Sequence, residues 1–197
     1  MRRRLVLASA SPRRRDLLET LGLAFEVRPV DVDETPLADE APTDLVLRLA
    51  RAKASARSGA GEIVLAADTI VVLDDEILLK PVDAADARRL LRTIQGRRHV
   101  VHTGVAVLDG DSGEILSAVD TTEVDMAPLD DARIAWYVAT DEPMDKAGAY
   151  AIQGIGAAFV ESIAGNYTNV VGLPLPTVRS LLGEAGHELL DFGSSGG

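Results

Sequence analysis

The sequence predicts an α/β fold in which a mixed, twisted sheet is flanked by helices. Short apolar runs typical of buried strands alternate with segments of helical periodicity along the first half of the chain. Residues 100–128 have the pattern of two strands around a DGDSG turn, which predicts a long antiparallel hairpin. No repeat, linker or low-complexity segment divides the chain, so these elements should form one mixed, partly antiparallel sheet.

Each expected element follows from local residue patterns. The helix that begins at Pro12 has Ser11 as a candidate N-cap and Gly22 as its stop. The stretch from residue 145 to 174 is rich in glycine and should be looped. Strands are expected at 4–10, 25–30, 63–68, 69–75 and 75–79 and within the hairpin, and helices at 12–22, 43–58, 83–96, 130–140 and 175–190.

Length and composition set limits on the domain organisation. The chain has 197 residues, of which 47% are hydrophobic, and this is enough for a sizeable core. We expect a single domain over residues 1–190 and a disordered tail over 191–197. The chain has no cysteine, which excludes disulfides, thiolate metal sites and cysteine nucleophiles.

Charge and hydropathy restrict the partners. The formal net charge is −11, so the overall field repels nucleic acid. The N-terminal apolar run is too short for a signal peptide, because Pro12 and three arginines interrupt it. No stretch reaches the roughly 18 apolar residues of a membrane span. We therefore expect a cytoplasmic protein with no nucleic-acid or membrane partner, and the acidic surface leaves a homodimer open.

Three arginines, Arg13, Arg14 and Arg15, directly follow the predicted helix start. The first turn of a helix already carries about half a positive charge, so cations there are disfavoured by roughly 0.3–1 kcal/mol each. In an acidic protein this arrangement favours a small anion site at the helix N-terminus. A run of arginines is also typical of a solvated helix face, and the residues alone leave both interpretations open.

Two carboxylates follow apolar strand patterns. Asp68 ends one such run, and open α/β sheets bind ligands beyond the C-terminal ends of their strands. An aspartate that only forms a turn explains the same position equally well. Glu34 closes the sequence DVDE, in which Asp31 and Asp33 add two further carboxylates. Such loops are usually solvated, but oxygen ligands of this kind also suit Mg²⁺ or Mn²⁺.

Two lysines complete the set of candidate site residues. Val46, Ala50 and Lys53 are spaced i, i+4 and i+7, so this lysine lies in an apolar helix stripe. It either extends along the stripe to water or places its ammonium among the carboxylates. Lys80 follows a predicted strand and precedes a proline. Cations, a metal and a carboxylate that activates water are the groups that phosphate chemistry requires.

Other common site types have little support in the sequence. His99 and His102 are three residues apart in a strand pattern, so their side chains should point to opposite faces. Together with the distant His187, they do not have the spacing of a zinc site or a Ser-His-Asp triad. No GxGxxG motif follows a strand and no GxxxxGK motif occurs, so neither dinucleotide nor Walker-type binding is indicated.

Seven motifs occur together and in this order: SASPRRRDLL, DVDE, LARAKA, AADTIVV, LLKP, GRRHVVHTGV and KAGAYAIQGIGAAFVESIAGNYTNVVGLPL. With them, the chain resembles the Maf family of nucleotide pyrophosphatases from about residue 5 to 183. The resemblance implies an ITPase-like α/β fold with two lobes around a nucleotide cleft. It also implies hydrolysis of a nucleoside triphosphate to the monophosphate and pyrophosphate, assisted by Mg²⁺ or Mn²⁺.

The resemblance further implies roles for individual residues. Asp68 matches the family's proton acceptor, which would activate the attacking water. Glu34 is the implied metal ligand, together with Asp68 acting through a bridging water, while Lys53 and Lys80 would meet the phosphates. The family's substrate-binding positions are matched by Ser9, Arg13, Arg14, Thr69 and Gln153.

The combination of AYAIQG and NYTNVVGLP resembles the branch of the family that cleaves dTTP and UTP. A glutamine amide both donates and accepts, so Gln153 can pair with the O4 and N3–H edge of thymine or uracil. Two alternatives remain open, a 7-methyl-GTP pyrophosphatase and a non-catalytic nucleotide-binding regulator of cell division. Turnover measured across a panel of nucleotides distinguishes the 7-methyl-GTP pyrophosphatase from the leading hypothesis. The effect of Asp68→Asn distinguishes the non-catalytic regulator from it.

Overall fold

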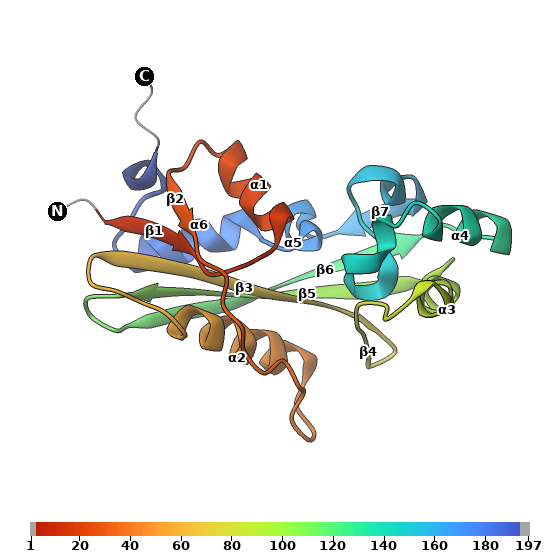
Figure 1. Ribbon diagram of the computed structural model, residues 1–197, viewed down its shortest axis with the longest axis horizontal. Coiled ribbons are helices and arrows are strands. Elements are labelled where there is room, and N and C mark those ends of the chain that lie inside the picture. The colour runs from red at the N-terminus through yellow and green to blue at the C-terminus, as the bar shows by residue number, and fades with distance from the viewer. Residues whose placement is uncertain (1–2, 194–197) are drawn as a thin grey trace. The chain divides into compact units, whose positions relative to one another are not determined.

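The computed structural model describes residues 3–193 and confirms the expected α/β fold with a mixed sheet (Figure 1). Its strands are β1 (Arg4–Leu7), β2 (Phe25–Val27), β3 (Glu62–Leu73), β4 (Glu76–Leu78), β5 (Arg98–Asp109), β6 (Ile115–Met126) and β7 (Val160–Ala164). Its α-helices are α1 (Pro12–Thr20), α2 (Pro42–Ser55), α3 (Ala84–Ile94), α4 (Asp131–Val138), α5 (Tyr167–Val171) and α6 (Leu175–Glu184). Short 3₁₀ helices are η1 (Glu142–Asp145), η2 (Ala147–Ala149), η3 (Gly154–Phe159) and η4 (Leu189–Phe192).

The strands are hydrogen-bonded in the order β2-β1-β3-β5-β6-β7, and β4 pairs separately with β3. β1 is parallel to both β2 and β3, as expected for strands that are connected through helices. β4 is antiparallel to β3, and β7 is antiparallel to β6. The sheet is therefore mixed.

The chain divides into two compact units. Unit 1 comprises Met1–Asp68, Thr103–Asp120 and Gly172–Gly197, and unit 2 comprises Thr69–His102 and Thr121–Val171. The long strands β3, β5 and β6 contribute residues to both units. Each unit has a hydrophobic core of its own.

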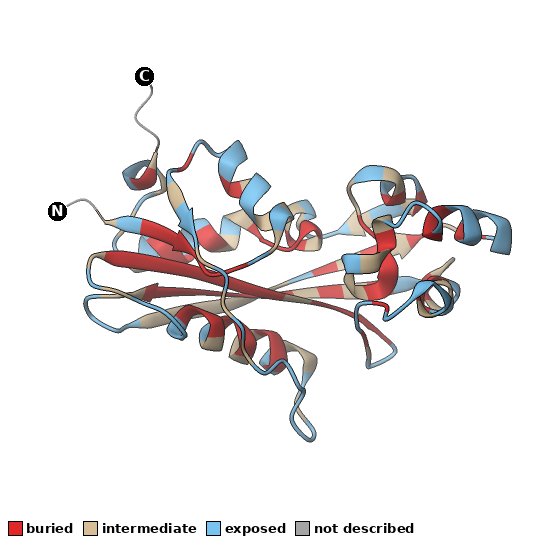
Figure 2. Cartoon of the chain, in the orientation of Figure 1, coloured by how far each residue is buried: buried red, intermediate tan, exposed pale blue. Residues whose placement is uncertain are grey.

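Unit 1 has helices on both faces of its strands, because alternate residues of a strand point to opposite sides. Leu7 and Leu65 belong to a core that includes side chains of α1 and α6. Val6 and Val64 belong to another core, which includes Ala50 of α2. In Figure 1, α2 covers one face of these strands, and α1 and α6 cover the other. A strand that is covered on both faces has a nearly continuous apolar sequence, and Figure 2 shows β3 buried along most of its length.

Unit 2 packs α3, α4 and the 3₁₀ helices η1, η2 and η3 around a core of its own. Asp83 caps α3 by accepting a hydrogen bond of 2.8 Å from the backbone N–H of Asp86. The helical periodicity predicted for this segment is confirmed, because one face of α3 is buried. That face consists of Ala87, Leu90, Leu91 and Ile94.

The structure corrects the expected course of β3. It is one strand of 12 residues, where the sequence analysis expected two segments that meet at Asp68 and Thr69. The backbone stays extended past Asp68 because β4 pairs with β3 farther along, at Val71, Val72 and Leu73. Asp68 therefore lies inside a strand and not at its end.

The structure also contains elements that the sequence analysis missed. β7 and α5 lie in the segment from 145 to 174, which was expected to be looped. Pairing with β6 keeps β7 extended although its pattern is weak, and Val124 lies opposite Ile163. Elsewhere β2 ends at Val27, three residues before the expected end of that strand, and α6 ends at Glu184, well before the expected residue 190.

Part of the expected disordered tail is ordered. Phe192 is 2% exposed and belongs to the core of unit 1, and Gly193 forms a β-bridge with Leu23. The backbone N–H of Ala24 also donates to the carbonyl of Phe192 at 2.6 Å. Burial of this aromatic ring fixes residues 191–193, so the expectation of a disordered tail was wrong for them. Residues 194–197 lie outside the described part of the chain.

Candidate active site

The side chain of Lys53, in α2, is the centre of the candidate site. Its Nζ donates one hydrogen bond to Oε1 of Glu34 and another to Oδ1 of Asp68, each 2.6 Å long. The side chains of Lys53 and Asp68 are only 10% and 11% exposed, whereas that of Glu34 is 59% exposed. Of the two alternatives for this lysine, the structure therefore supports an ammonium placed among carboxylates.

The register of α2 explains why Lys53 is buried. Leu49 and Ala50 lie one turn before it on the same helix face, and both are buried. The helix also approaches β5 very closely, since a Cβ at Gly104 would lie 2.2 Å from the carbonyl oxygen of Val46. Only a glycine allows this approach, which places the apolar stripe, and the lysine with it, against the sheet.

The alternation of β3 explains why Asp68 points toward α2. Val64, Ala66 and Asp68 share one face of the strand, and the first two belong to the core that includes α2. The pairing of β3 with β1 ends where Leu65 lies opposite Leu7. Asp68 thus lies three residues past that pairing, beyond the C-terminal end of β1, where α/β sheets commonly bind ligands.

Ser9 and Arg14 are connected at the start of α1. Oγ of Ser9 accepts a hydrogen bond of 3.2 Å from the N–H of Ser11 and one of 3.1 Å from Nη1 of Arg14. Nε of Arg14 donates to the carbonyl of Gly172 at 2.8 Å, which fixes the guanidinium from a second side. Ser11 is the N-cap residue, as expected, but its side chain makes no capping hydrogen bond.

The charge of Arg14 is partly removed from water. Burial lowers the pKa of its guanidinium, while the carboxylates of Asp68 and Glu34 act in the opposite direction. Arg14 is therefore within electrostatic range of both carboxylates that Lys53 binds. A dehydrated cation at the N-terminus of a helix favours a bound anion, because the anion replaces some of the lost hydration.

The other two arginines of this helix have different surroundings. Arg15 is exposed and forms long ion pairs with Asp16 and Glu19, so it belongs to the solvated helix face. Arg13 is half-buried. The first turn of α1 contains no acidic residue, so its own sequence does not balance the helix dipole.

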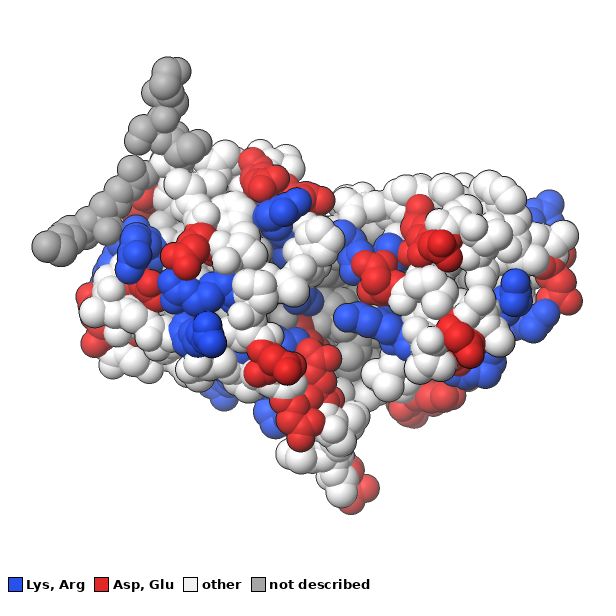
Figure 3. Space-filling view, viewed as in Figure 1, with Lys and Arg blue, Asp and Glu red and all other residues white. Residues whose placement is uncertain are grey.

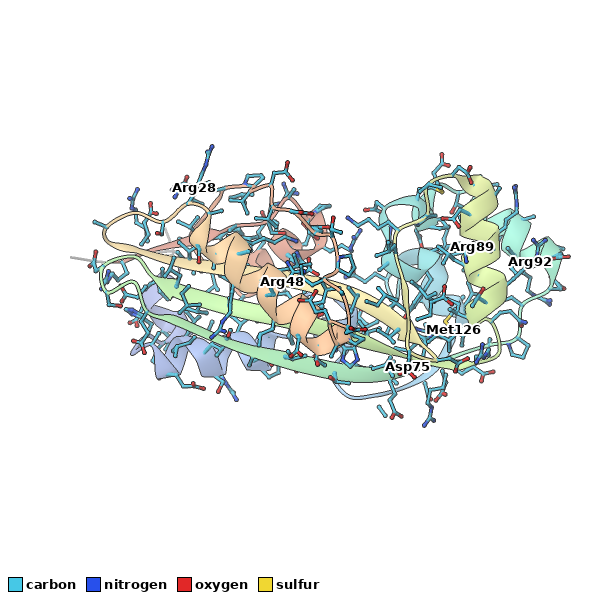
Figure 4. The ribbon with its side chains drawn as sticks, turned by 90° about the horizontal axis from the view of Figure 1, so that it is seen from below. Arg28, Arg48, Asp75, Arg89, Arg92 and Met126 are labelled. Carbon is cyan, nitrogen blue, oxygen red and sulfur yellow. The ribbon has the colours of Figure 1, made fainter. Side chains whose placement is uncertain are left out.

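Arg48 in α2 is a residue that the sequence analysis missed (Figure 4). Its guanidinium forms hydrogen bonds of 2.6 and 2.8 Å with the carboxylate of Glu40, and a third of 3.1 Å with the carbonyl of Thr35. The loop that carries Glu34 is thereby fastened to α2. No local pattern indicates this contact, because residues 40 and 48 lie on either side of the helix start.

The acidic loop does not form a protein-only metal cage. Within residues 3–193, no group of three or more His, Cys, Asp or Glu side chains could hold a metal ion. Asp33 instead accepts a hydrogen bond of 3.0 Å from the N–H of Thr35, as turn-forming aspartates do. Glu34 and Asp68 each have a second carboxylate oxygen besides the one bound to Lys53. This donor set fits Mg²⁺, which proteins often bind through one or two carboxylates plus substrate phosphates.

The remaining predicted site residues lie in unit 2. Thr69 is half-buried and directly follows Asp68 in β3. Lys80 is exposed and comes two residues after the end of β4. Gln153 is half-buried and is the residue that precedes η3. The structure therefore brings Ser9, Arg14, Glu34, Lys53 and Asp68 together in unit 1, and places Thr69, Lys80 and Gln153 in unit 2.

The two histidines of β5 differ in burial. His99 is 1% exposed, and its Nε2 forms a hydrogen bond of 2.7 Å with the hydroxyl of Tyr150. Burial lowers the pKa of His99 to about 4, so the ring is neutral at pH 7. His102 is half-buried, and its Nδ1 lies 2.9 Å from Oγ1 of Thr121.

Charged side chains of both signs are interspersed over the face shown in Figure 3. The acidic excess of the sequence is thus not gathered into one large patch on this face.

In the part of the chain that the structure describes, no helix combines the length and the apolar character needed to cross a membrane.

The fold and the site together define an α/β protein in which a buried lysine, an arginine and two carboxylates are gathered in unit 1. The chain belongs to the Maf family, because the family model described as "Maf-like protein" matches residues 4–185. A relative from Anaeromyxobacter dehalogenans (strain 2CP-C), named dTTP/UTP pyrophosphatase, is 60% identical over 188 residues, covering 94% of this chain and 96% of the relative. A protein of the same name from Pelotomaculum thermopropionicum is 49% identical, covering 94% of this chain and 98% of the relative.

Proposed function

We propose that this protein hydrolyses dTTP and UTP to the nucleoside monophosphate and pyrophosphate. Membership of the Maf family and the names of the relatives support the activity and its substrates. The structural observation that carries the proposal is the pair of hydrogen bonds from the buried Nζ of Lys53 to Asp68 and Glu34. These bonds hold two carboxylates at one place beside the cation Arg14.

In this proposal Asp68 is the general base. A water molecule attacks the α-phosphorus of the substrate while its proton passes to the carboxylate of Asp68. The bond between the α-phosphorus and the oxygen that bridges it to the β-phosphorus breaks, and pyrophosphate leaves with that oxygen. A base must lie within hydrogen-bonding reach of the proton that it removes, and Lys53 fixes the orientation of Asp68 for this purpose.

The cations stabilise the negative charge of the triphosphate. Arg14, oriented by Ser9 and by the carbonyl of Gly172, donates to phosphoryl oxygens at the N-terminus of α1. Arg13 on the same helix and Lys80 are further proposed phosphate ligands. Oriented cations of this kind act mainly on the charge that develops as the bond breaks, so they contribute to catalysis as well as to binding.

A divalent cation, Mg²⁺ or Mn²⁺, is the proposed cofactor. Glu34 is the residue that would hold it, with Asp68 contributing through a bridging water, and phosphate oxygens of the substrate would supply further ligands. When bound, such an ion neutralises phosphoryl charge and orients the triphosphate.

Gln153 and Thr69 are the proposed determinants of base selection. The amide of Gln153 can accept from N3–H and donate to O4 of thymine or uracil, whereas cytosine presents the opposite pattern at these positions.

Nucleoside triphosphates are produced and used in the cytoplasm, so we propose that the enzyme acts there.

A substrate panel tests the proposed function. Pyrophosphate release is measured with Mg²⁺ or Mn²⁺ across dTTP, UTP, CTP, GTP, ATP and 7-methyl-GTP. We expect turnover to be highest for dTTP and UTP. A preference for 7-methyl-GTP would replace the pyrimidine assignment, and a folded protein that binds nucleotides without any turnover would favour the regulatory alternative.

A further inference from the structure

A hydrogen-bonded network in unit 2 lies directly beside Gln153. Oε1 of Glu142 accepts hydrogen bonds from the N–H of Gly156 at 2.9 Å and from the hydroxyl of Tyr137 at 2.8 Å. Oε2 of Glu142 accepts a third from the N–H of Ile155 at 2.9 Å. The Tyr137 hydroxyl in turn accepts a hydrogen bond of 3.2 Å from the N–H of Ala151. The network thus holds the backbone on both sides of Gln153.

The two glycines near Gln153 make this network sterically possible. A Cβ at Gly154 would lie 2.5 Å from Oε2 of Glu142, and a Cβ at Gly156 would lie 2.5 Å from the hydroxyl of Tyr137. Gly154 also has a φ of +67°, which side chains rarely allow. Glycine at these two positions therefore allows the carboxylate of Glu142 and the hydroxyl of Tyr137 to lie against the backbone of this segment.

Glu142 performs the capping that the residue before a helix normally performs. The first N–H groups of a helix have no partner within it, and a side chain at the N-cap position usually accepts from them. Gln153 occupies that position before η3, but its side chain makes no capping hydrogen bond. Because Glu142 accepts from Ile155 and Gly156 instead, capping does not engage the Gln153 amide.

Glu142 performs this role as a carboxylate. Burial opposes its ionisation, but the hydrogen bonds from Gly156, Ile155 and Tyr137 hold the pKa of this carboxyl below its ordinary value. Two acceptor oxygens are needed for the three donors. A glutamine at this position would have one acceptor oxygen and would direct an NH₂ group at a donor.

We propose that Glu142 is a positioning residue for base selection, which together with Tyr137 fixes residues 151–156 so that the Gln153 amide is presented to the pyrimidine base. This inference rests on the proposed function, in which Gln153 contacts the base. Glu142 itself contacts neither the substrate nor the reacting atoms. Its effect should therefore be seen in KM and in substrate preference and not in the chemical step.

The test compares Glu142→Gln, Tyr137→Phe and Gln153→Ala, with Glu161→Gln as the control at an exposed position of β7. Steady-state kinetics with UTP and CTP gives the ratio of their kcat/KM values for each variant. For Glu142→Gln we expect this ratio to fall about tenfold, mostly through KM for UTP, with kcat at saturating UTP changed less than about threefold. Tyr137→Phe retains both acceptor oxygens of Glu142 and should show a smaller change in the same direction, and Glu161→Gln should show none.

A double-mutant cycle shows whether Glu142 acts through Gln153. In the Gln153→Ala background, adding Glu142→Gln should leave the UTP to CTP ratio unchanged, because the group that it positions is absent. The inference would be overturned if Glu142→Gln lowered the UTP to CTP ratio as much in the Gln153→Ala background as in the wild type. It would also be overturned if Glu142→Gln alone left this ratio unchanged. If Gln153→Ala alone leaves the preference intact, or the wild type turns over neither nucleotide, the proposed function fails and the inference fails with it.

Discussion

Lys53 and Asp68 form an ion pair of 2.6 Å in which both side chains are nearly buried. A buried carboxylate that loses its partner retains a large desolvation cost, which an exposed one does not. The two residues come from α2 and β3, so the pair ties the helix to the strand at the point where the site is built.

Lys53→Met should destabilise the protein as well as inactivate it. The substitution preserves the apolar stem of the side chain but leaves Asp68 without its cation, and we expect the free energy of unfolding to fall by about 3 kcal/mol. Urea denaturation measures the loss. The control is Arg133→Gln, which breaks the exposed i,i+3 pair with Asp130 and should change stability by less than about 0.5 kcal/mol. Equal losses in the two variants would contradict the assignment of a buried pair.

Gly104→Ala should be strongly destabilising, because its Cβ would overlap the backbone of α2 at Val46. We expect a loss of about 3 kcal/mol or more, since backbone cannot move aside as a flexible side chain can. Gly183→Ala is the matched control in α6, where a Cβ would meet nothing within 4 Å. That substitution should be neutral or stabilise by up to about 1 kcal/mol, because alanine favours a helix. Thermal unfolding of both variants makes the comparison, and similar melting temperatures would rule out the close approach.

His99 should make stability depend on pH. Its pKa is about 4 in the folded protein against an ordinary value of 6.5, because burial disfavours the charged ring. Between these values the unfolded chain binds more protons than the folded one, so stability falls as pH falls from 6.5 toward 4. Between pH 7.5 and 5 we expect this group to account for a loss of about 2 kcal/mol.

Chemical denaturation at the two pH values tests this prediction on the wild type and on His99→Gln, which cannot titrate. The variant should lose less stability over the same interval, whatever its stability at pH 7.5. The other titrating groups contribute to both proteins and cancel in the difference. An identical pH dependence in the two proteins would show that His99 is not buried as a neutral ring.

Arg13→Ala should raise KM for UTP, and the effect should be larger at low ionic strength. A contact between a guanidinium and a phosphate is electrostatic, and salt screens it. Initial rates at two salt concentrations provide the measurement. Arg15→Ala on the same helix is the control, because Arg15 is exposed and pairs with Asp16 and Glu19. A loss that is the same at both salt concentrations would assign Arg13 a structural role instead.

Features with a clear period could be predicted from the sequence. The apolar stripe of α2 placed Lys53 on a buried face, and the alternation of helices and strands indicated the α/β class. The acidic partners of that lysine could not be found in this way. Glu34 and Asp68 reach Lys53 from a loop and from β3, and no local pattern encodes which of several carboxylates lies close to it.

The segment from 145 to 171 shows a second reason why prediction fails. The start of its 3₁₀ helix η3 is held by a side chain from elsewhere in the chain, because Glu142 accepts from the N–H groups of Ile155 and Gly156. Glycine content alone therefore indicated a loop. The proposed roles of Thr69, Lys80 and Gln153 came from motifs shared with a family, because their local patterns are compatible with ordinary structural positions.

Replacement of Asp68 by asparagine tests the central claim most directly. Pyrophosphate release from dTTP and UTP is measured for the wild type, for Asp68→Asn and for Asp74→Asn. The control makes the same chemical change at the residue that follows the C-terminal end of β3, which is exposed and has a positive φ that asparagine tolerates. We predict that Asp68→Asn lowers kcat by at least about 100-fold while Asp74→Asn stays within about twofold of the wild type. A folded Asp68→Asn variant with near-normal turnover would contradict the assignment of Asp68 as the base.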